Sequence, residues 1–405
     1  MKRIALTICA LAAALGLTAG GLALADSHTP ASSHVPAARV NHRHAATYKA
    51  PVIHHVWIIV LENESESVSF GADSPAPYLA KTLVKSGAFL KNYYATGHVS
   101  NDNYISMISG QPPNLENQSD CQKFSNFSPN LGTGSYGAQR GIGCVYPSDI
   151  QNIATQLDAH GYTWRDYNQD MDADPARDEQ ATCSHPAIGQ TDASQEDTPT
   201  EHYATRHNPF VYFHAIIDNA ALCDSHVVNL NDLPADLRSA SKTPDYSFIT
   251  PDLCGDGHDS TGSDCIAPAD PGGFTGIDKF LEAWVPKITH SPAYTKQHGL
   301  LLITFDEAST SDASGCCGEI PGPGSPLPGL AGSGGGLVGA IVLSPCIKPG
   351  TVSSVDYNHY AMLGSIENLF HLPHLGYAQL PQETYFGKDV FTNTSCKPPP
   401  KKNKK

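Results

Sequence analysis

Residues 299–307 read GLLLITFDE, an uninterrupted apolar run that ends in Asp306 and Glu307. Residues 55–63 repeat the arrangement with HVWIIVLEN, which ends in Glu62 and Asn63. A run of this kind, without polar alternation, is typical of a parallel strand that is buried on both faces. Because ligands collect at the carboxyl ends of parallel strands, the two runs predict that four oxygen-bearing side chains meet at one edge of a sheet.

The rest of the chain alternates strand-like and helix-like stretches. This order predicts an α/β fold with a mostly parallel, doubly wound sheet and helices on both faces. We expect strands at 55–61, 89–95, 162–167, 226–229, 246–250, 299–305 and 337–344. We expect helices at 78–86, 101–109, 149–160, 209–221, 274–289 and 359–371. Gly and Pro concentrate at 315–336, which predicts an irregular loop there.

The two ends of the chain differ in composition from its middle. Residues 1–25 combine two cations, an apolar stretch and a small-residue end, which predicts a secretory signal peptide, with a membrane anchor as the alternative. Residues 26–50 predict a disordered leader. Residues 397–405 predict a disordered basic tail that aids solubility, with weak contact with anionic surfaces as the alternative. Residues 51–396 then form one domain without a transmembrane segment. We expect a secreted protein, outside the cell or in its envelope.

Charge and cysteine content narrow the class of protein. The formal net charge is −15, which argues against nucleic acid as a partner because phosphate backbones require clustered Lys and Arg. Ten of the 11 cysteines lie after residue 25. An even number predicts five disulfides in an oxidising compartment, with a zinc-thiolate site as the alternative. Proximity in the sequence suggests the pairs Cys121–Cys144 and Cys254–Cys265.

Carboxylate and amide oxygens at the two strand ends suit a hard cation. Glu62, Asn63, Asp306 and Glu307 are therefore candidate ligands of a divalent cation of unknown identity. For Glu62 and Asn63 the alternative is that they cap the following segment.

Two further stretches carry polar groups where a strand or loop ends. Ser100 stands where a loop enters a short helix, a location that suits a phosphate oxyanion, although the residue could simply cap the helix. A serine hydroxyl becomes a strong nucleophile only when a base or a metal activates it. Residues 248–259 read FITPDLCGDGHD, an apolar strand followed by acids and His258. These acids could instead form turns.

Taken in order, the motifs are Glu-Asn, Gly-His-x-Ser-x-x-Asn-Tyr, Arg-His-Asn-Pro, Thr-Pro-Asp-x-x-x-Asp-x-His-Asp, Thr-x-Asp-Glu and Asn-His-Tyr. This series resembles the bacterial and fungal phosphoesterase family of secreted acid phosphatases and non-haemolytic phospholipases C, within the alkaline phosphatase superfamily. The resemblance covers about residues 52–380. It implies an alkaline-phosphatase-like fold with disulfide-pinned loop excursions, and the hydrolysis of phosphate esters.

The resemblance also implies roles for individual residues. Glu62, Asn63, Asp306 and Glu307 would hold one divalent cation, rather than two, and Ser100 would bind that metal and attack phosphorus. The remaining expected site residues are catalytic His258, His207 and Asn103 and substrate-binding His98, His359 and Asp256. Protonation of His207 or His258 would explain activity at acidic pH.

The chain departs from the family pattern next to the expected nucleophile. Val99 and Asp102 stand where the family has proline, and Asp252 stands where many relatives have Asn. We expect Asp102 to add negative charge beside the phosphate. The sequence favours a phosphomonoesterase, with a phosphoinositide headgroup as one candidate substrate. The alternatives are a phospholipase C or other phosphodiesterase, and a secreted phosphate-binding protein without turnover.

Overall fold

The computed structural model describes residues 50–396 except 173, 175, 178, 196, 263, 267, 268 and 395. The described residues all belong to one compact unit. The expected signal peptide, the leader apart from Ala50, and the basic tail lie outside the described residues. Within those residues, none of the helices is both long and apolar enough to cross a lipid bilayer.

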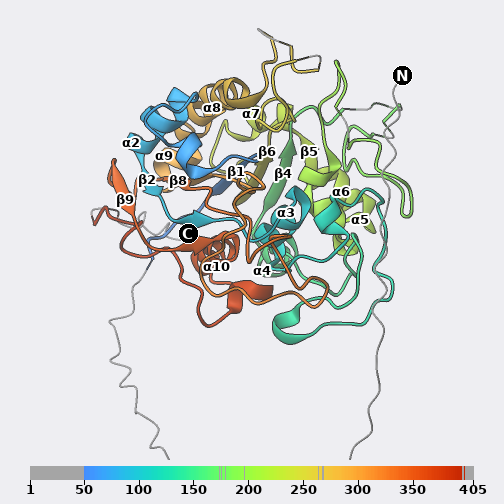
Figure 1. Ribbon diagram of the computed structural model, residues 1–405. Coiled ribbons are helices and arrows are strands. Elements are labelled where there is room, and N and C mark those ends of the chain that lie inside the picture. Colours follow the sequence, from blue (N-terminus) through green and yellow to red (C-terminus); the bar gives the residue numbers. More distant parts are fainter. Residues whose placement is uncertain are drawn as a thin grey trace, which may run out of the picture. The chain divides into compact units, whose positions relative to one another are not determined.

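An eight-stranded sheet forms the centre of this unit, in the order β5-β4-β6-β1-β7-β8-β2-β9 (Figure 1). The strands are β1 (Val56–Leu61), β2 (Ala88–Leu90), β4 (Trp164–Asn168), β5 (Val227–Asn229), β6 (Tyr246–Thr250), β7 (Leu300–Phe305), β8 (Ala340–Leu343) and β9 (Thr351–Ser353). Only β8 is antiparallel to its neighbours β7 and β2, so the expected mostly parallel sheet is confirmed. A separate pair joins β3 (Tyr93–Tyr94) to β10 (Tyr357–Asn358).

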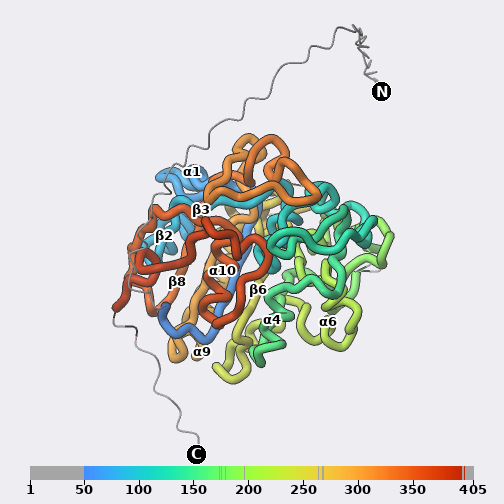
Figure 2. Tube along the Cα trace, turned by 90° about the horizontal axis from the view of Figure 1, so that it is seen from below, coloured from blue at the N-terminus to red at the C-terminus, as the bar shows by residue number. Residues whose placement is uncertain are grey.

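Helices cover both faces of the sheet, as expected for a doubly wound fold. Figure 1 shows α8 and α9 on one side and α3, α4 and α10 on the other, and Figure 2 shows α10 and α4 side by side. The longer helices are α3 (Ser100–Ser109), α4 (Ile153–His160), α6 (Ala220–His226), α8 (Gly273–Thr289) and α10 (His359–Phe370). The shorter elements include α1 (Glu66–Ser69), the π-helical η1 (Tyr78–Leu83), α2 (Val84–Ser86), α5 (His214–Ile217), α7 (Leu233–Asp236) and α9 (Pro292–Lys296).

Strands β1 and β7 lie side by side at the middle of the sheet, and every residue of both strands is buried. Their apolar sequences match this position, because a central parallel strand has helices over both faces. The parallel register pairs Val56 with Leu300 and Leu61 with Phe305. The residues that follow each strand therefore emerge together at the same edge of the sheet.

Five disulfides pin the loops around this sheet, and they include both pairs expected from the sequence, Cys121–Cys144 and Cys254–Cys265. The other three are Cys183–Cys223, Cys316–Cys317 and Cys346–Cys396. All ten cysteines after residue 25 are paired. The zinc-thiolate alternative is excluded for these cysteines, and an oxidising compartment is indicated.

The helix expected at 209–221 was wrong as a single element. The chain forms a 3₁₀ turn at Pro209–Tyr212 and then two separate helices, α5 and α6. Phe213 is extended (φ −130°, ψ 121°) between them. Backbone bonds explain the break, because Tyr146 N donates to Tyr212 O and His214 N donates to Tyr146 O.

Candidate active site

The ends of β1 and β7 bring Glu62, Asn63 and Asp306 together, as the sequence predicted. The backbone N–H of Asn63 donates to Asp306 Oδ1 at 3.1 Å, although the two residues are 243 positions apart. Asp306 N in turn donates to Leu61 O at 2.8 Å. Asn63 has a positive φ of 56°. Asn adopts this conformation more readily than most residues, which suits it to the sharp turn away from the strand.

Ser100 is the first residue of α3 and lies against the same acids. Its hydroxyl donates to Glu62 Oε2 at 2.9 Å, and it also interacts with the carboxylate of Asp306. All ten residues of α3 are buried, so the helix is held firmly in place. The N-terminus of a helix carries partial positive charge, which favours an anion near Ser100.

His207 lies between two carboxylates on the other side of Glu62. Its Nε2 is 3.4 Å from Glu62 Oε1, and its Nδ1 is 3.2 Å from Asp256 Oδ2. Tyr104 stacks on the imidazole, with ring centroids 5.1 Å apart and 9° between the planes, and its hydroxyl donates to Glu62 Oε1 at 2.6 Å. Tyr104 had no predicted role, although it belongs to the same motif as Ser100.

Burial dominates the protonation of this cluster. It raises the pKa of Glu62 well above its usual range, and the neighbouring Asp306 and Asp256 raise it further. Burial also raises the pKa of Asp306 to about 6 and that of Asp256 well above the usual range for Asp. The same desolvation, together with Arg206 and His258, lowers the pKa of His207 well below 6.5. These shifts do not support the expectation that His207 becomes protonated at acidic pH.

Several buried oxygen atoms of this cluster fit a cation. Within the described part of the chain, Asn63 Oδ1, Asp306 Oδ2 and Asp256 Oδ2 are buried and accept no hydrogen bond. Leaving buried polar atoms without partners is costly, and burying several carboxylates together costs more. A divalent cation that is bound by Glu62, Asn63 and Asp306 would offset both costs with ligands of the type that hard cations prefer.

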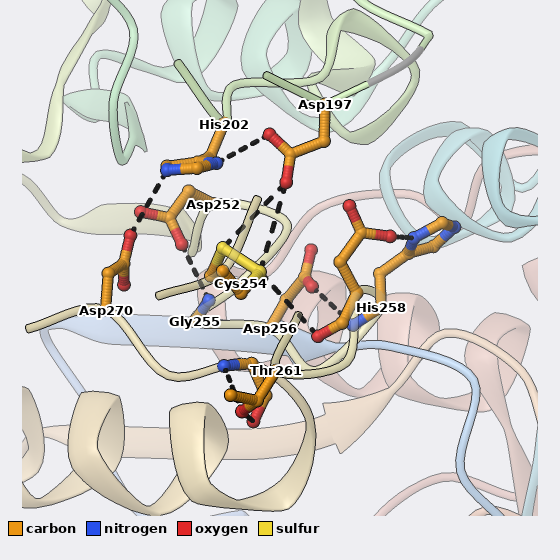
Figure 3. Close-up of a disulfide and its surroundings, with 12 residues drawn as sticks. Asp197, His202, Asp252, Cys254, Gly255, Asp256, His258, Thr261 and Asp270 are labelled. Carbon is orange, nitrogen blue, oxygen red and sulfur yellow. Dashed lines mark hydrogen bonds and ion pairs between the residues drawn. A yellow bond between two sulfur atoms is a disulfide. The ribbon is translucent and has the colours of Figure 1, made fainter. Parts of the chain in front are cut away.

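Loop 251–265 brings the second group of predicted residues to the site from β6. Asp256 is buried and its Oδ1 accepts from His258 N at 2.8 Å. Figure 3 shows His258 and Asp256 beside the Cys254–Cys265 disulfide that closes this loop. The His258 ring lies 5.8 Å from the ring of His207, so both predicted histidines reach the site.

Arg206 is a functional candidate without a predicted role, although it directly precedes His207. The side chain is buried, and its Nη2 donates to His258 Nε2 at 3.2 Å. Asp259 accepts from His258 Nδ1 at 2.8 Å, so the imidazole is held from both sides. Asp120 lies 4.0 Å from Arg206 Nε and accepts a hydrogen bond from the backbone of Asn101. Nothing in the sequence pointed to Asp120 except its neighbour Cys121.

Asn103 supports the site through the loop before Ser100. Its Oδ1 accepts from the backbone N–H groups of Thr96 and Gly97, each at 3.0 Å, and its Nδ2 donates to the carbonyls of Gly97 and Val99. We expected this amide to orient the phosphoryl group. Both polar atoms of its side chain bond to loop 96–99, so in the structure Asn103 shapes this loop.

His98 and His359 were expected to bind substrate, and both have protein partners here. His359 is fully buried, donates from Nε2 to Asp306 O at 2.6 Å and accepts at Nδ1 from Tyr93 at 3.1 Å. His98 donates from Nε2 to Asp312 O at 3.0 Å and contacts Glu307 through Nδ1. The two histidines therefore support the strand end and Glu307, and the structure does not leave their ring nitrogens free for substrate.

Two of the three departures from the family pattern, Asp102 and Asp252, are buried acids. Asp102 is fully buried, and among the described residues neither of its carboxylate oxygens has a hydrogen-bond partner. Burial raises its pKa well above the usual range, so the structure does not support the expected negative charge beside the phosphate. Asp252 accepts from Gly255 N at 2.6 Å and shapes the turn after β6, and burial raises its pKa to about 7.

Comparison with known proteins shows which family this sequence matches. The model of the phosphoesterase family matches residues 69–373. A probable acid phosphatase of Kluyveromyces lactis is 25% identical over 79% of this chain, which spans 59% of that relative's length. A phosphatidylinositol-3-phosphatase of Mycobacterium tuberculosis is 24% identical over 81% of this chain and 80% of its own length. A solved protein of the alkaline phosphatase superfamily from Vibrio parahaemolyticus aligns with 80% of this chain and 68% of its own at 13% identity, with a TM-score of 0.46.

Proposed function

We propose that this chain, which belongs to the phosphoesterase family, hydrolyses phosphate monoesters with Ser100 as the nucleophile. One observation carries the proposal: the Ser100 hydroxyl sits at the N-terminus of a buried helix and donates to Glu62 at 2.9 Å. The nucleophile Ser100, its proton acceptor Glu62 and the anion-binding end of α3 therefore lie together. The curated relatives that carry the name acid phosphatase support the same activity.

The reaction has two steps. Ser100 Oγ transfers its proton to Glu62 and forms a bond to phosphorus, while the bond from phosphorus to the substrate oxygen breaks and the alcohol leaves with a proton taken from a water molecule. The hydroxide that remains then bonds to phosphorus, the bond to Oγ breaks, and Oγ takes its proton back from Glu62, which releases hydrogen phosphate and restores Ser100. When bound by Glu62, Asn63 and Asp306, a divalent cation would lower the pKa of the serine hydroxyl and stabilise charge in the transition state.

Arg206 is the group best placed for the phosphoryl oxygens, because both ring nitrogens of His258 are engaged, Nδ1 with Asp259 and Nε2 with Arg206. The guanidinium carries a permanent positive charge, and its contact with His258 Nε2 holds the imidazole beside the reaction centre. His207 remains within 3.4 Å of Glu62 and stacks on Tyr104, so it fixes the carboxylate that faces Ser100. Fixed donors of this kind act where charge develops and need no rearrangement during the reaction.

The proposal also covers the substrate of the enzyme and its location. The chain spans 59% and 53% of the two fungal acid phosphatases compared with it, so their full activities need not apply. The mycobacterial relative acts on phosphatidylinositol 3-phosphate by its name, which supports a phosphoinositide headgroup as a candidate substrate. Five disulfides support secretion.

Replacing the nucleophile tests the proposal directly. Ser100→Ala should lower turnover of p-nitrophenyl phosphate by about 10³-fold or more, because the covalent step is lost. Ser109→Ala is the matched control, since Ser109 is buried at the other end of α3 and bonds only to the helix backbone and Gln111. Acid quenching of the wild type should leave a phosphoryl group on the peptide that contains Ser100. Wild-type turnover in Ser100→Ala would reject the mechanism.

A further inference from the structure

A cavity of about 480 Å³ opens beside the candidate active site. Arg206 and His258 belong to its lining, Arg206 contacts His258, and the His258 ring lies 5.8 Å from that of His207 in the candidate active site. A second wall contains Asp120, whose carboxylate accepts from the backbone of Asn101, the neighbour of Ser100. A phosphate ester that is held at Ser100 would therefore direct its alcohol portion into this cavity.

The cavity is lined by acids and amides. Four carboxylates line it, from Asp120, Asp197, Asp259 and Asp264, against the single guanidinium of Arg206 and the imidazole of His258. The amides of Gln122 and Gln195 line it too, with Gln122 Nε2 donating to Gln195 Oε1 at 2.8 Å. None of the described residues that line it has a large apolar side chain.

Several of these acids are held in fixed positions. Asp197 accepts from His202 Nδ1 at 2.6 Å and packs against both sulfur atoms of the Cys254–Cys265 disulfide, as Figure 3 shows. Asp259 accepts from His258 at 2.8 Å and lies in the same disulfide-closed loop. Fixed acceptors distinguish ligands better than mobile ones, because they cannot turn away from an unfavourable group.

We propose that this cavity is the leaving-group pocket and that it selects alcohols that are rich in hydroxyl groups and carry no second anion, which favours a free polyol phosphate over a phosphoinositide, whose alcohol carries a phosphodiester anion. The inference rests on the proposed function and extends it to the class of substrate. Hydroxyl groups donate hydrogen bonds to the carboxylates and amides of the wall. A second phosphate or a carboxylate on the alcohol meets the acids at short range, where like charges repel. An apolar alcohol gains no apolar contact from the wall.

Three monoesters with a three-carbon alcohol test the inference. Glycerol 3-phosphate carries two hydroxyls, 3-phosphoglycerate carries a carboxylate in place of one of them, and propyl phosphate carries neither. We expect kcat/KM for glycerol 3-phosphate to exceed that for each of the other two by about tenfold, the range for one added charge or two lost hydrogen bonds. Equal or faster turnover of 3-phosphoglycerate would overturn the inference.

Two variants shift the selectivity in opposite directions. Asp264→Asn removes one wall charge and should lower the ratio of glycerol 3-phosphate to 3-phosphoglycerate by about fivefold, whereas Gln122→Glu adds a charge on an exposed side chain and should raise it by a similar factor. Asp73→Asn, an exposed acid outside the cavity, is the control and should leave the ratio unchanged. A ratio that neither lining variant moves would also overturn the inference.

The same experiment separates this inference from the proposed function. If wild-type protein turns over p-nitrophenyl phosphate but shows no preference among the three monoesters, the leaving-group inference fails and the phosphomonoesterase remains. If none of the four esters is hydrolysed, the proposed function fails and the inference falls with it.

Discussion

Tyr104→Phe isolates the contribution of a single hydrogen bond to the proposed cation site. The phenol donates to Glu62 Oε1 at 2.6 Å, while Glu62 Oε2 faces Ser100. The ring also stacks on His207, and phenylalanine keeps that contact. The substitution therefore removes one donor from a proposed ligand and leaves the packing intact.

The size of the effect follows from the bond that is lost. A buried hydrogen bond to a charged group contributes about 1.5–3 kcal/mol, which corresponds to about 10- to 150-fold in an equilibrium constant. Partners that orient metal ligands typically change metal affinity by about 10–100-fold when they are removed. We expect the cation concentration for half-maximal activity to rise by at least about tenfold, with kcat at saturating cation within about threefold of the wild type.

The assay begins with chelator-treated protein, to which Mg²⁺, Mn²⁺, Ca²⁺ or Zn²⁺ is added back in separate titrations. Thermal unfolding at each cation concentration gives a second measurement that does not depend on turnover, because a bound cation stabilises the folded state. Tyr246→Phe is the control: its hydroxyl is buried and, among the described residues, makes no hydrogen bond. If Tyr104→Phe and the wild type reach half-maximal activity at the same cation concentration, the hydrogen bond from Tyr104 to Glu62 does not support cation binding.

The other predictions concern the cation, pH and backbone geometry. Removal of divalent cations from the wild type should abolish turnover and lower the melting temperature, and both should return when the activating cation is added back; full activity in chelator would refute the cation site. Burial raises the pKa of Asp166 to about 8. The contribution of protonated Asp166 to the free energy of unfolding is therefore complete below pH 4 and falls by about 1.4 kcal/mol per pH unit as the pH rises to 8. Asp166→Asn should flatten the pH profile of the free energy of unfolding over this interval. Gly110→Ala should destabilise the fold by about 2 kcal/mol or more, because φ is +66° and the new Cβ would lie 2.4 Å from Leu375 O. Gly161 has a φ of +76° and open space around it, so Gly161→Ala should lose only the stability that the unfavourable φ costs. Equal melting temperatures for the two variants would contradict this reasoning.

The sequence predicted the centre of the site well because strand register is a strong constraint. Two apolar runs that are buried on both faces must pair near the middle of a parallel sheet, so the polar residues after them meet at one edge. The meeting of Asn63 with Asp306 depends on nothing else. The position of Ser100 was predictable for a similar reason, since a loop that enters a helix offers free backbone donors.

The supporting contacts were not predictable, because they depend on how loops fold over the sheet. Tyr104 meets Glu62 only once α3 lies across the end of β1, and no local pattern encodes that position. Asn103 illustrates the opposite error, since the family motif suggested a substrate contact whereas its amide binds loop 96–99. The edge strand β9 was missed because a three-residue, partly exposed strand has little apolar pattern.

The buried acids account for the rigid frame of this site and for the cation that we propose there. Glu62, Asp256, Asp306 and Glu307 each have a raised pKa, chiefly because burial disfavours their charged forms. Without a cation, these acids can stay buried together only if they are protonated or if the surrounding sheet is stable enough to hold them. Strands β1 and β7 supply that stability, because all their residues are buried. A cation removes the need for protonation, which leaves Glu62 free to accept the proton of Ser100. Catalytic competence and cation binding therefore depend on the same carboxylates, so a change that weakens one should weaken the other.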